Sequence, residues 1–420
     1  MLTNKPGLLE EIRNRFAYVD HCPHQGSRIF FENAGGALTL ESVVETSGKF
    51  AAIPDNQGRD NPASRELVDV INKAKSDTLL FLNASSGQIF VGESGTELLF
   101  RMISNAIIES EKGGNVIGTT LEHPASRSAA KRWARIAGKN YIAVPHNDET
   151  GSVDAQDYAR LVTRETRVAT IIHTSPVTGM AVDVASVAKA IRAVSPDCYI
   201  IVDGIQHAAH GGLDIDAYDI DGYAISPYKV FSRHGYGIAW ISDRLTALPH
   251  DSLEGGPEGN WELGTRDTGA YATFSKVVEY FEWLGESFTD SADRRQKIVS
   301  ASKAIHAHEK ALTDAMLHGV GNLKGLADMT SVNIIGGIDN PRREGLVALS
   351  VDGIESGELV SQLREQGIRV HIRKDDHYSG NILKPLGLPS CIRVSMCHYN
   401  SEHEVSQFLA VMANLTKNKV

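Results

Sequence analysis

Hydrophobic patterns typical of helices and of strands alternate along the chain from about residue 64. Residues 64–83 and 96–108 carry apolar side chains at helical spacing, whereas 88–92 and 115–120 are short apolar runs of the kind found in buried strands. More runs of the second kind follow at 139–146, 167–173, 198–203, 222–226 and 235–242. Strands that alternate with helices form mostly parallel sheets covered on both faces, so the pattern predicts an α/β fold of this type.

The pattern changes after Gly264. A long charged stretch with helical character runs from Ser291 to His318, and short strand-like runs then mix with helices. These strand-like runs lie at 332–337, 346–351, 368–374 and 392–396. We therefore expect a smaller α+β domain after the first. The predicted parts are an N-terminal segment that packs on the small domain or across the cleft (1–30), a large domain (31–270) and a small C-terminal domain (271–420).

Composition argues against two classes of partner. The 420 residues carry a formal net charge of −10 and no basic cluster, so nucleic acid is not an expected partner. No apolar run approaches the roughly 20 residues of a membrane span, and the first residues lack an apolar signal core, so we expect a cytoplasmic protein. Four cysteines are spread along the chain without the spacing of a disulfide framework or a zinc site, and no metal is expected. They are Cys22, Cys198, Cys391 and Cys397.

Polar side chains follow several of the predicted strands at their carboxyl ends, where ligands bind in parallel sheets. Asp203 ends the run 198–203, and Lys229 follows the next run. Taken alone, this pair favours a plain salt bridge over a catalytic site. His123 follows the run 115–120, and Ser175 follows 167–173.

A phosphate-binding turn is a second candidate feature at this edge. Gly95 and Thr96 open a helix directly after the run 88–92, and Ser94 with Glu97 fits a capping box. The free N–H groups of a helix start bind phosphate, although a plain helix cap has the same sequence. A lysine, a buried carboxylate, an imidazole and a phosphate site together suit pyridoxal phosphate, with Asp203 facing the ring nitrogen rather than Lys229.

From about Phe30 to its end, the chain resembles the class V aminotransferase family of fold-type I pyridoxal-phosphate enzymes, in particular the cysteine desulfurase-like and isopenicillin N epimerase-like branch. The segments VDGIQHAAH and SPYKVFSRHGYGIAW carry this resemblance. It implies a sheet of the seven-stranded type. It also implies that Lys229 forms the Schiff base, that Asp203 holds the ring nitrogen and that His123 stacks on the ring. The other cofactor contacts it implies are Gln206 to the ring hydroxyl and Gly95, Thr96 and Ser226 to the phosphate.

Three further segments extend the resemblance. In ELGTRDTGAY, Thr265 is expected to reach the phosphate of a neighbouring subunit, which implies a homodimer with composite sites. In IRVSMCHYNSEHEV, Arg393 is expected to bind the substrate carboxylate, since its planar donors match a carboxylate, although a surface ion pair is the alternative. In FFENAGGA, Asn33 is expected close to the substrate.

The chain also departs from this family. The persulfide-forming desulfurases carry a cysteine in the segment that corresponds to 369–387, and here that segment has none. Ser175 is followed by proline where the family has asparagine, and Tyr228 stands where desulfurases have histidine, so a phosphate contact there becomes phenolic. His371 is a candidate substrate contact on the same small-domain segment.

The predicted function is that of a pyridoxal-phosphate-dependent lyase without a persulfide cysteine. Its expected substrate is a small, β- or γ-substituted amino acid, from which Lys229 removes the Cα proton. An aminotransferase, an epimerase, and a decarboxylase or decarboxylative aldolase remain alternatives, because all begin from charge at Cα. A cofactor-binding scaffold without activity is the alternative outside enzymes, and the retained Lys229, Asp203 and Arg393 argue against it.

Overall fold

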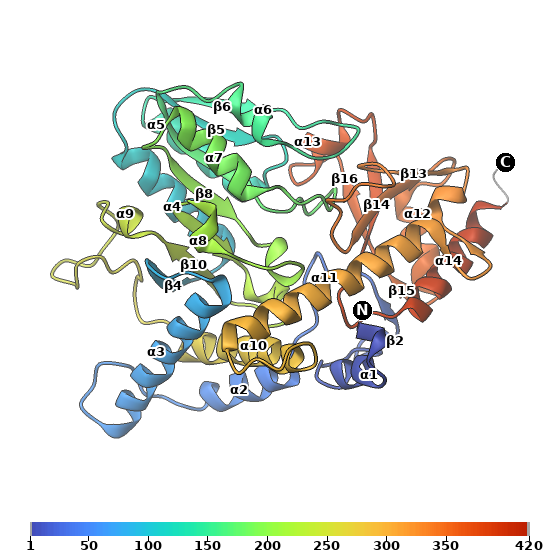
Figure 1. The fold of residues 1–420 in the computed structure, drawn as a ribbon, viewed down its shortest axis with the longest axis horizontal. Helices are drawn as coiled ribbons and strands as arrows, with labels where there is room; N and C mark the ends of the chain where they lie inside the picture. Colours follow the sequence, from blue (N-terminus) through green and yellow to red (C-terminus); the bar gives the residue numbers. More distant parts are fainter. Residues whose placement is uncertain (1, 418–420) are drawn as a thin grey trace.

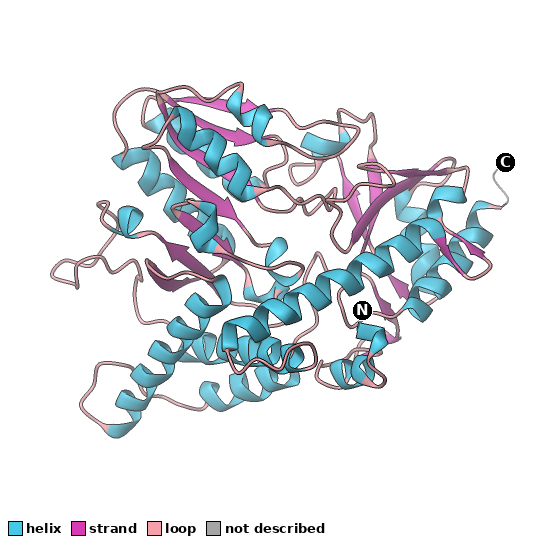
Figure 2. Cartoon of the chain, viewed as in Figure 1, coloured by secondary structure: helices cyan, strands magenta, loops and turns pink. Residues whose placement is uncertain are grey.

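The computed structural model describes residues 2–417. Its central sheet has seven strands in the order β4-β10-β9-β8-β7-β5-β6 (Figures 1 and 2). Neighbouring strands from β9 to β6 are parallel, whereas β10 is antiparallel to both β4 and β9. This confirms the predicted α/β fold with a mostly parallel sheet. The strands are β4 (Gln88–Gly92), β5 (Asn115–Thr119), β6 (Asn140–Val144), β7 (Thr166–Ile172), β8 (Tyr199–Asp203), β9 (Gly222–Ile225) and β10 (Gly237–Ile241).

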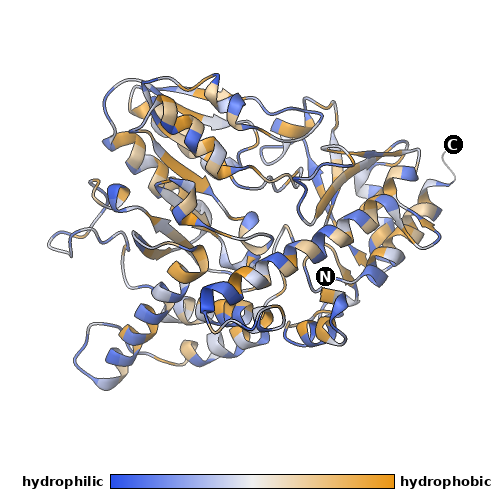
Figure 3. Ribbon diagram, viewed as in Figure 1, coloured by the Kyte–Doolittle hydropathy of each residue, from blue (hydrophilic) through white to orange (hydrophobic). Residues whose placement is uncertain are grey.

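Helices cover both faces of this sheet because successive side chains of a strand point to opposite faces. In β8, Ile200 and Val202 join the core that includes α3 (Pro62–Leu82), α7 (Val184–Val194) and α10 (Thr268–Glu286). Ile201 joins the opposite core, with α4 (Gly95–Glu109) and α5 (Pro124–Ile136). With both faces buried, the strands are continuously apolar, and Figure 3 shows them mostly in the hydrophobic colour.

A second core lies around a four-stranded antiparallel sheet of order β13-β14-β17-β16. The long helix α11 (Arg294–His318) joins the two cores, because Ile298 and Ile305 pack in the first and Leu312 and Met316 in the second. The core of the large sheet thus extends through α10 into α11, beyond the predicted boundary at residue 270. The remaining elements here are β13 (Val332–Ile334), β14 (Leu346–Val351), β16 (His371–Lys374), β17 (Ser390–Ser395), α12 (Ser356–Glu365) and α14 (Glu402–Thr416).

The N-terminal segment contacts both cores. Strand β3 (Ile29–Phe30) pairs in parallel with β15 (Ile368–Arg369), next to the small sheet, while α1 (Leu8–Arg13) buries Leu8 and Ile12 in the core of the large sheet. The single strand expected over 368–374 is therefore two strands with different partners, β15 and β16. In the part of the chain that the structure describes, no helix is long and apolar enough to span a membrane.

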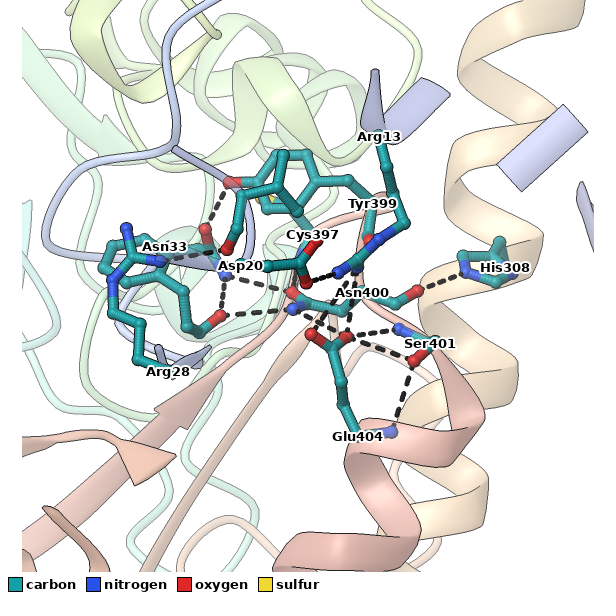
Figure 4. A network of polar contacts seen from close by, with 12 residues as sticks. Arg13, Asp20, Arg28, Asn33, His308, Cys397, Tyr399, Asn400, Ser401 and Glu404 are labelled. Carbon is teal, nitrogen blue, oxygen red and sulfur yellow. Dashed lines mark hydrogen bonds and ion pairs between the residues drawn. The ribbon is translucent and has the colours of Figure 1, made fainter. Parts of the chain in front are cut away.

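A buried polar network joins the N-terminal segment to the end of the chain (Figure 4). Asn33 Nδ2 donates to the carbonyl of Ser395 at 2.8 Å and to Asn400 Oδ1 at 3.2 Å, and Asn33 Oδ1 accepts from the hydroxyl of Tyr399. Asn400 Nδ2 in turn donates to the carbonyl of Phe30 at 3.2 Å. Each buried polar group thus has a partner, which is what makes such a network stabilising.

Replacement of Asn400 tests this network. Asn400→Ala removes the acceptor of the buried Cys397 amide, 2.9 Å away, together with the contacts to Asn33 and to the carbonyl of Phe30, so we expect the free energy of unfolding to fall by about 2 to 4 kcal/mol. Urea denaturation followed by circular dichroism measures this loss. Asn333→Ala is the control: it removes one bond to Asp352 on the surface and should change stability by less than about 0.5 kcal/mol. Equal effects of the two substitutions would contradict a structural role for the network.

Candidate active site

A cavity with about 370 Å³ of empty space lies at the carboxyl ends of the parallel strands. Five strands deliver side chains to it, since β4, β5, β7, β8 and β9 all end at this edge. Its lining consists of Thr96, His123, Ile172, Thr174, Pro176, Asp203, Ile205, Gln206, Ser226, Tyr228 and Lys229. The structure therefore brings most of the predicted cofactor-binding residues together at one place.

Lys229 lies at the end of a short 3-10 helix, Pro227–Lys229, that follows β9. Its Nζ donates a hydrogen bond to Gln206 Oε1 at 3.2 Å. Burial lowers the pKa of Lys229 to about 7, and the charge of Arg393 lowers it further, whereas Asp203 opposes the shift. A large share of this amine is therefore unprotonated near neutral pH, which is the form that attacks a carbonyl carbon.

Asp203 is the last residue of β8 and is only 3% exposed. Burial raises the pKa of its carboxyl to about 6, while the N–H of Ile205 at 3.1 Å and the charge of Lys229 favour its ionised form. Within residues 2–417, no ion pair connects Asp203 with Lys229. The two groups line the same cavity without contact, so a ligand between them can meet an amine and a carboxylate separately.

His123 is the N-cap residue of α5. Its Nδ1 accepts a hydrogen bond from the amide of Ala125 at 3.2 Å, so the proton of the neutral ring is on Nε2. Burial lowers the pKa of His123 to about 3, helped by the charges of Lys229 and Arg373. The side chain is therefore a neutral aromatic ring, suited to stacking rather than to pairing with an anion.

The start of α4 forms a seat for an anion. Ser94 Oγ accepts from the amide of Glu97 at 3.1 Å, and none of the hydrogen bonds within residues 2–417 satisfies the amides of Gly95 and Thr96. A Cβ atom at Gly95 would stand only 2.5 Å from Ser226 Oγ, so glycine leaves the space between the helix start and that hydroxyl open. Two free amides at the positive end of a helix, beside two hydroxyls, suit a phosphate group.

The small sheet presents two guanidinium groups and an imidazole on one face. In the register of β16 and β17, His371 lies opposite Arg393, and Arg373 lies two residues further along the same face. Arg393 is 2% exposed, and burial lowers its pKa to about 9. Its Nη1 donates to the carbonyl of Pro176 at 2.8 Å, whereas Nε is buried without a partner. The nearest acid, Glu32, is paired with His371 and Arg369.

Three predicted site residues have other surroundings in the structure. The hydroxyl of Ser175 accepts from the amides of Val177 and Thr178 rather than lining the cavity, and its neighbour Thr174 lines it instead. Asn33 uses its amide in the network of Figure 4, which leaves it no free group for a substrate. Thr265 is exposed and outside the cavity of its own chain.

Tyr228 and His371 also have partners of their own. The ring of Tyr228 stacks on His234 with centroids 4.2 Å apart while it lines the cavity. His371 Nδ1 lies 3.2 Å from Glu32 Oε1, with the side chain 39% exposed. Both therefore remain candidates for contacts with a bound ligand.

Sequence reasoning missed several residues of this site. Ile205 lines the cavity, and an apolar side chain in a turn between Asp203 and Gln206 carried no signal of that. Glu122 is buried behind His123, and burial together with the charge of Asp203 raises its pKa to about 8, so that it is mainly protonated at neutral pH. In the sequence, only the position of Glu122 directly before His123 pointed to a place near the site.

A comparison with protein families identifies the family to which this chain belongs. The model of the family "Aminotransferase class-V" matches residues 29–408. The chain belongs to the aminotransferase class-V family. The predicted resemblance is thereby confirmed, and this class V protein is a pyridoxal-phosphate-dependent enzyme.

The class V protein matches its relatives over nearly their whole lengths. It is 24% identical to an aminotransferase-like protein of Gibberella zeae over 96% of this chain and 97% of that one, and 25% identical to a probable cysteine desulfurase of Halobacterium salinarum over 91% and 90%. The apo structure of a cysteine desulfurase from Thermococcus onnurineus NA1 has a TM-score of 0.80 at 21% identity, covering 97% of this chain and 98% of that one. This likeness confirms the fold-type I architecture.

Burial of the Lys229 amine leads us to expect that the free energy of unfolding of the cofactor-free protein depends on pH. Because folding lowers the pKa of Lys229 from 10.5 to about 7, the unfolded chain binds more protons between these values, and this contribution raises stability as pH increases through that window. Lys229→Met should remove it, up to about 1.4 kcal/mol per pH unit. Urea titrations from pH 7 to 9 measure the difference, with the exposed Lys189→Met as control. A slope equal in the native protein and Lys229→Met would contradict a buried amine.

Proposed function

We propose that this class V protein is a pyridoxal-phosphate-dependent lyase that acts on a small, β- or γ-substituted amino acid carrying a second anionic group. The cavity residues fit the cofactor, since they offer an amine for its carbonyl, a buried carboxylate for its ring nitrogen and an anion seat for its phosphate. The residues proposed to hold it are Gly95, Thr96, His123, Asp203, Gln206, Ser226, Tyr228 and Lys229. When bound, the cofactor supplies a ring that accepts electrons from Cα.

The protein side chains move and hold the protons. Lys229, with a pKa of about 7, is suited to take the Cα proton and return it, because a base works best when its pKa is close to the working pH. Asp203 is held mainly ionised near neutral pH and so keeps a ring nitrogen protonated. The neutral ring of His123 adds no charge above the site.

The proposal on substrate class rests on two guanidinium groups that form no ion pair in the described part of the chain, those of the buried Arg393 and the half-buried Arg373. Neither Arg393 nor Arg373 forms an ion pair within residues 2–417, and each lowers the pKa of Lys229. Arg393 suits the α-carboxylate of an amino acid. Arg373, whose Nε donates to Ser379 Oγ at 2.8 Å, is placed two residues along the same face for an anion on the side chain.

The cysteines do not suit sulfur transfer. Cys391 and Cys397 are buried, and burial raises the pKa of Cys391 to about 12, which keeps its thiol neutral and weakly nucleophilic. In the segment 369–387, Tyr378 lies near His123, with ring centroids 6.0 Å apart. The substituent of the substrate is therefore proposed to leave without an enzyme persulfide. Transamination, epimerisation and decarboxylation differ in the fate of the charge at Cα, and their products separate them.

The homodimer with composite sites belongs to the same proposal. Thr265 lies in an exposed loop, which is consistent with a role toward the phosphate of a second subunit rather than its own. Sedimentation of the cofactor-loaded protein tests the dimer.

Paired substrates test the proposed substrate class. We expect O-phosphoserine to react with kcat/KM at least about tenfold above O-acetylserine, because a charged hydrogen bond contributes roughly 1.5 to 3 kcal/mol. Elimination from O-phosphoserine, with water, yields phosphate, ammonia and a keto acid, all of which are measurable. Arg373→Met should remove the preference, whereas Arg393→Met should lower kcat/KM for both substrates. Arg364→Met, on the exposed face of α12, is the control. An unchanged preference in Arg373→Met would contradict the role of Arg373.

The anion seat is tested by cofactor affinity. Thr96→Ala and Ser226→Ala each remove a hydroxyl that lines the cavity, so we expect about a tenfold to hundredfold weaker binding of pyridoxal phosphate. Quenching of protein fluorescence during titration measures the affinity. Ser76→Ala, exposed on α3, should bind as the native protein does, and native affinity in both cavity variants would contradict the seat.

A further inference from the structure

A chain of three polar contacts leads from Lys229 into the interior of the protein. Lys229 Nζ donates to Gln206 Oε1 at 3.2 Å, and the other end of that amide, Nε2, lies 3.3 Å from His210 Nε2. His210 Nδ1 lies 2.8 Å from Glu309 Oε2, on the helix α11 that joins the two cores. His210 and Glu309 are 5% and 1% exposed, so solvent does not compete for these contacts.

The direction of these contacts depends on the protonation of His210. The Nδ1–H group faces the carboxylate, so Nε2 of a neutral ring holds a lone pair and accepts from Gln206 Nε2. The carbonyl end of the amide then faces Lys229, as the structure shows. A protonated ring donates from Nε2 instead. It therefore requires the carbonyl end of Gln206, which turns the NH₂ end toward the cavity.

We propose that His210 and Glu309 are positioning residues that set which end of the Gln206 amide faces the cofactor, and that protonated His210 presents the donor end. The inference rests on the proposed cofactor. The Gln206 amide, Lys229 and the hydroxyls of the anion seat, Thr96 and Ser226, all line the same cavity. With the phosphate in the seat and the carbonyl carbon at Lys229, Gln206, which contacts Lys229 directly, would be the side chain to hold the ring oxygen next to that carbon. This oxygen accepts hydrogen bonds once it is ionised, so a bound cofactor favours the Gln206 orientation with the NH₂ group toward the cavity. Because that orientation goes with a protonated His210, cofactor binding is accompanied by uptake of a proton at His210.

The surroundings of His210 support a proton there. Glu309 raises the pKa of His210, through its charge and its hydrogen bond, against the opposite effect of burial. Glu344 acts in the same direction from further away, although it is paired with His207 at 2.8 Å, and Lys229 opposes. The remaining groups that face this pair are the buried Cys397 and His398 and the exposed His306. Glu309 Oε1 has no hydrogen-bond partner among the described residues, so its charge is directed largely at His210.

Two cofactor analogues isolate this effect from the chemistry of Lys229. Pyridoxine 5′-phosphate has no aldehyde and keeps the ring hydroxyl, and its 3-deoxy analogue lacks that hydroxyl. In the native protein, we expect the affinity for pyridoxine 5′-phosphate to fall as pH rises through the pKa of His210. Glu309→Gln keeps the hydrogen bond but removes the charge, so the fall should move to a pH roughly 1 to 3 units lower. Fluorescence titration measures both profiles.

The 3-deoxy analogue is the control for a purely structural effect. It should bind native protein and Glu309→Gln with the same affinity and pH profile, because it offers no acceptor to Gln206. Nitrogen-15 NMR of histidine-labelled protein should show His210 become protonated when pyridoxine 5′-phosphate binds at neutral pH, and His210→Phe identifies its signal.

Three outcomes overturn the inference. Pyridoxine 5′-phosphate profiles that coincide in native protein and Glu309→Gln, or a His210 that stays neutral in the complex, contradict the positioning role and leave the cofactor assignment standing. Failure of both analogues to bind the native protein contradicts the cofactor assignment and this inference together.

Discussion

The site depends on one constraint: an amine and a carboxylate, Lys229 and Asp203, are buried at neighbouring strand ends without touching. Burial alone favours the neutral form of each, which is why both pKa values move toward neutrality. In direct contact they would form an ion pair, and the amine would stay protonated and unreactive. The sheet separates them, because Asp203 ends β8 while Lys229 stands in the turn after β9, and the two side chains line one cavity without forming an ion pair.

The small domain supplies the charge that the large sheet lacks. Arg393 and Arg373 approach the cavity from the face of β17 and β16, and neither is neutralised by a carboxylate of the described chain. Their placement depends on α11, which belongs to both cores, and on the N-terminal segment that joins β15. The positions of these two arginines therefore depend on how the two domains pack. A change in the angle between the domains would first alter the part of the site that is proposed to bind the substrate.

Sequence alone predicted the part of the site that follows from strand topology. Asp203, Lys229 and His123 follow apolar runs, and parallel strands bring such ends to one edge wherever the intervening helices pack. Ser175 shows the limit of this reasoning, because side chains near a strand end alternate in direction and its neighbour Thr174 lines the cavity instead. Asn33 carried no signal of its partners Ser395 and Tyr399, which lie more than 360 residues away in the chain. Glu309 was equally hidden, since nothing in a helix sequence reveals which distant histidine it meets.

The most direct measurement is to reduce the cofactor-loaded protein with borohydride and map the modified peptide by mass spectrometry. Reduction fixes the bond between a lysine amine and the carbonyl carbon of pyridoxal phosphate, so the label records which amine was attached. The account predicts one label per chain, on Lys229, and none in Lys229→Ala. A label on another lysine, or a native protein that remains unlabelled at saturating pyridoxal phosphate, would contradict it.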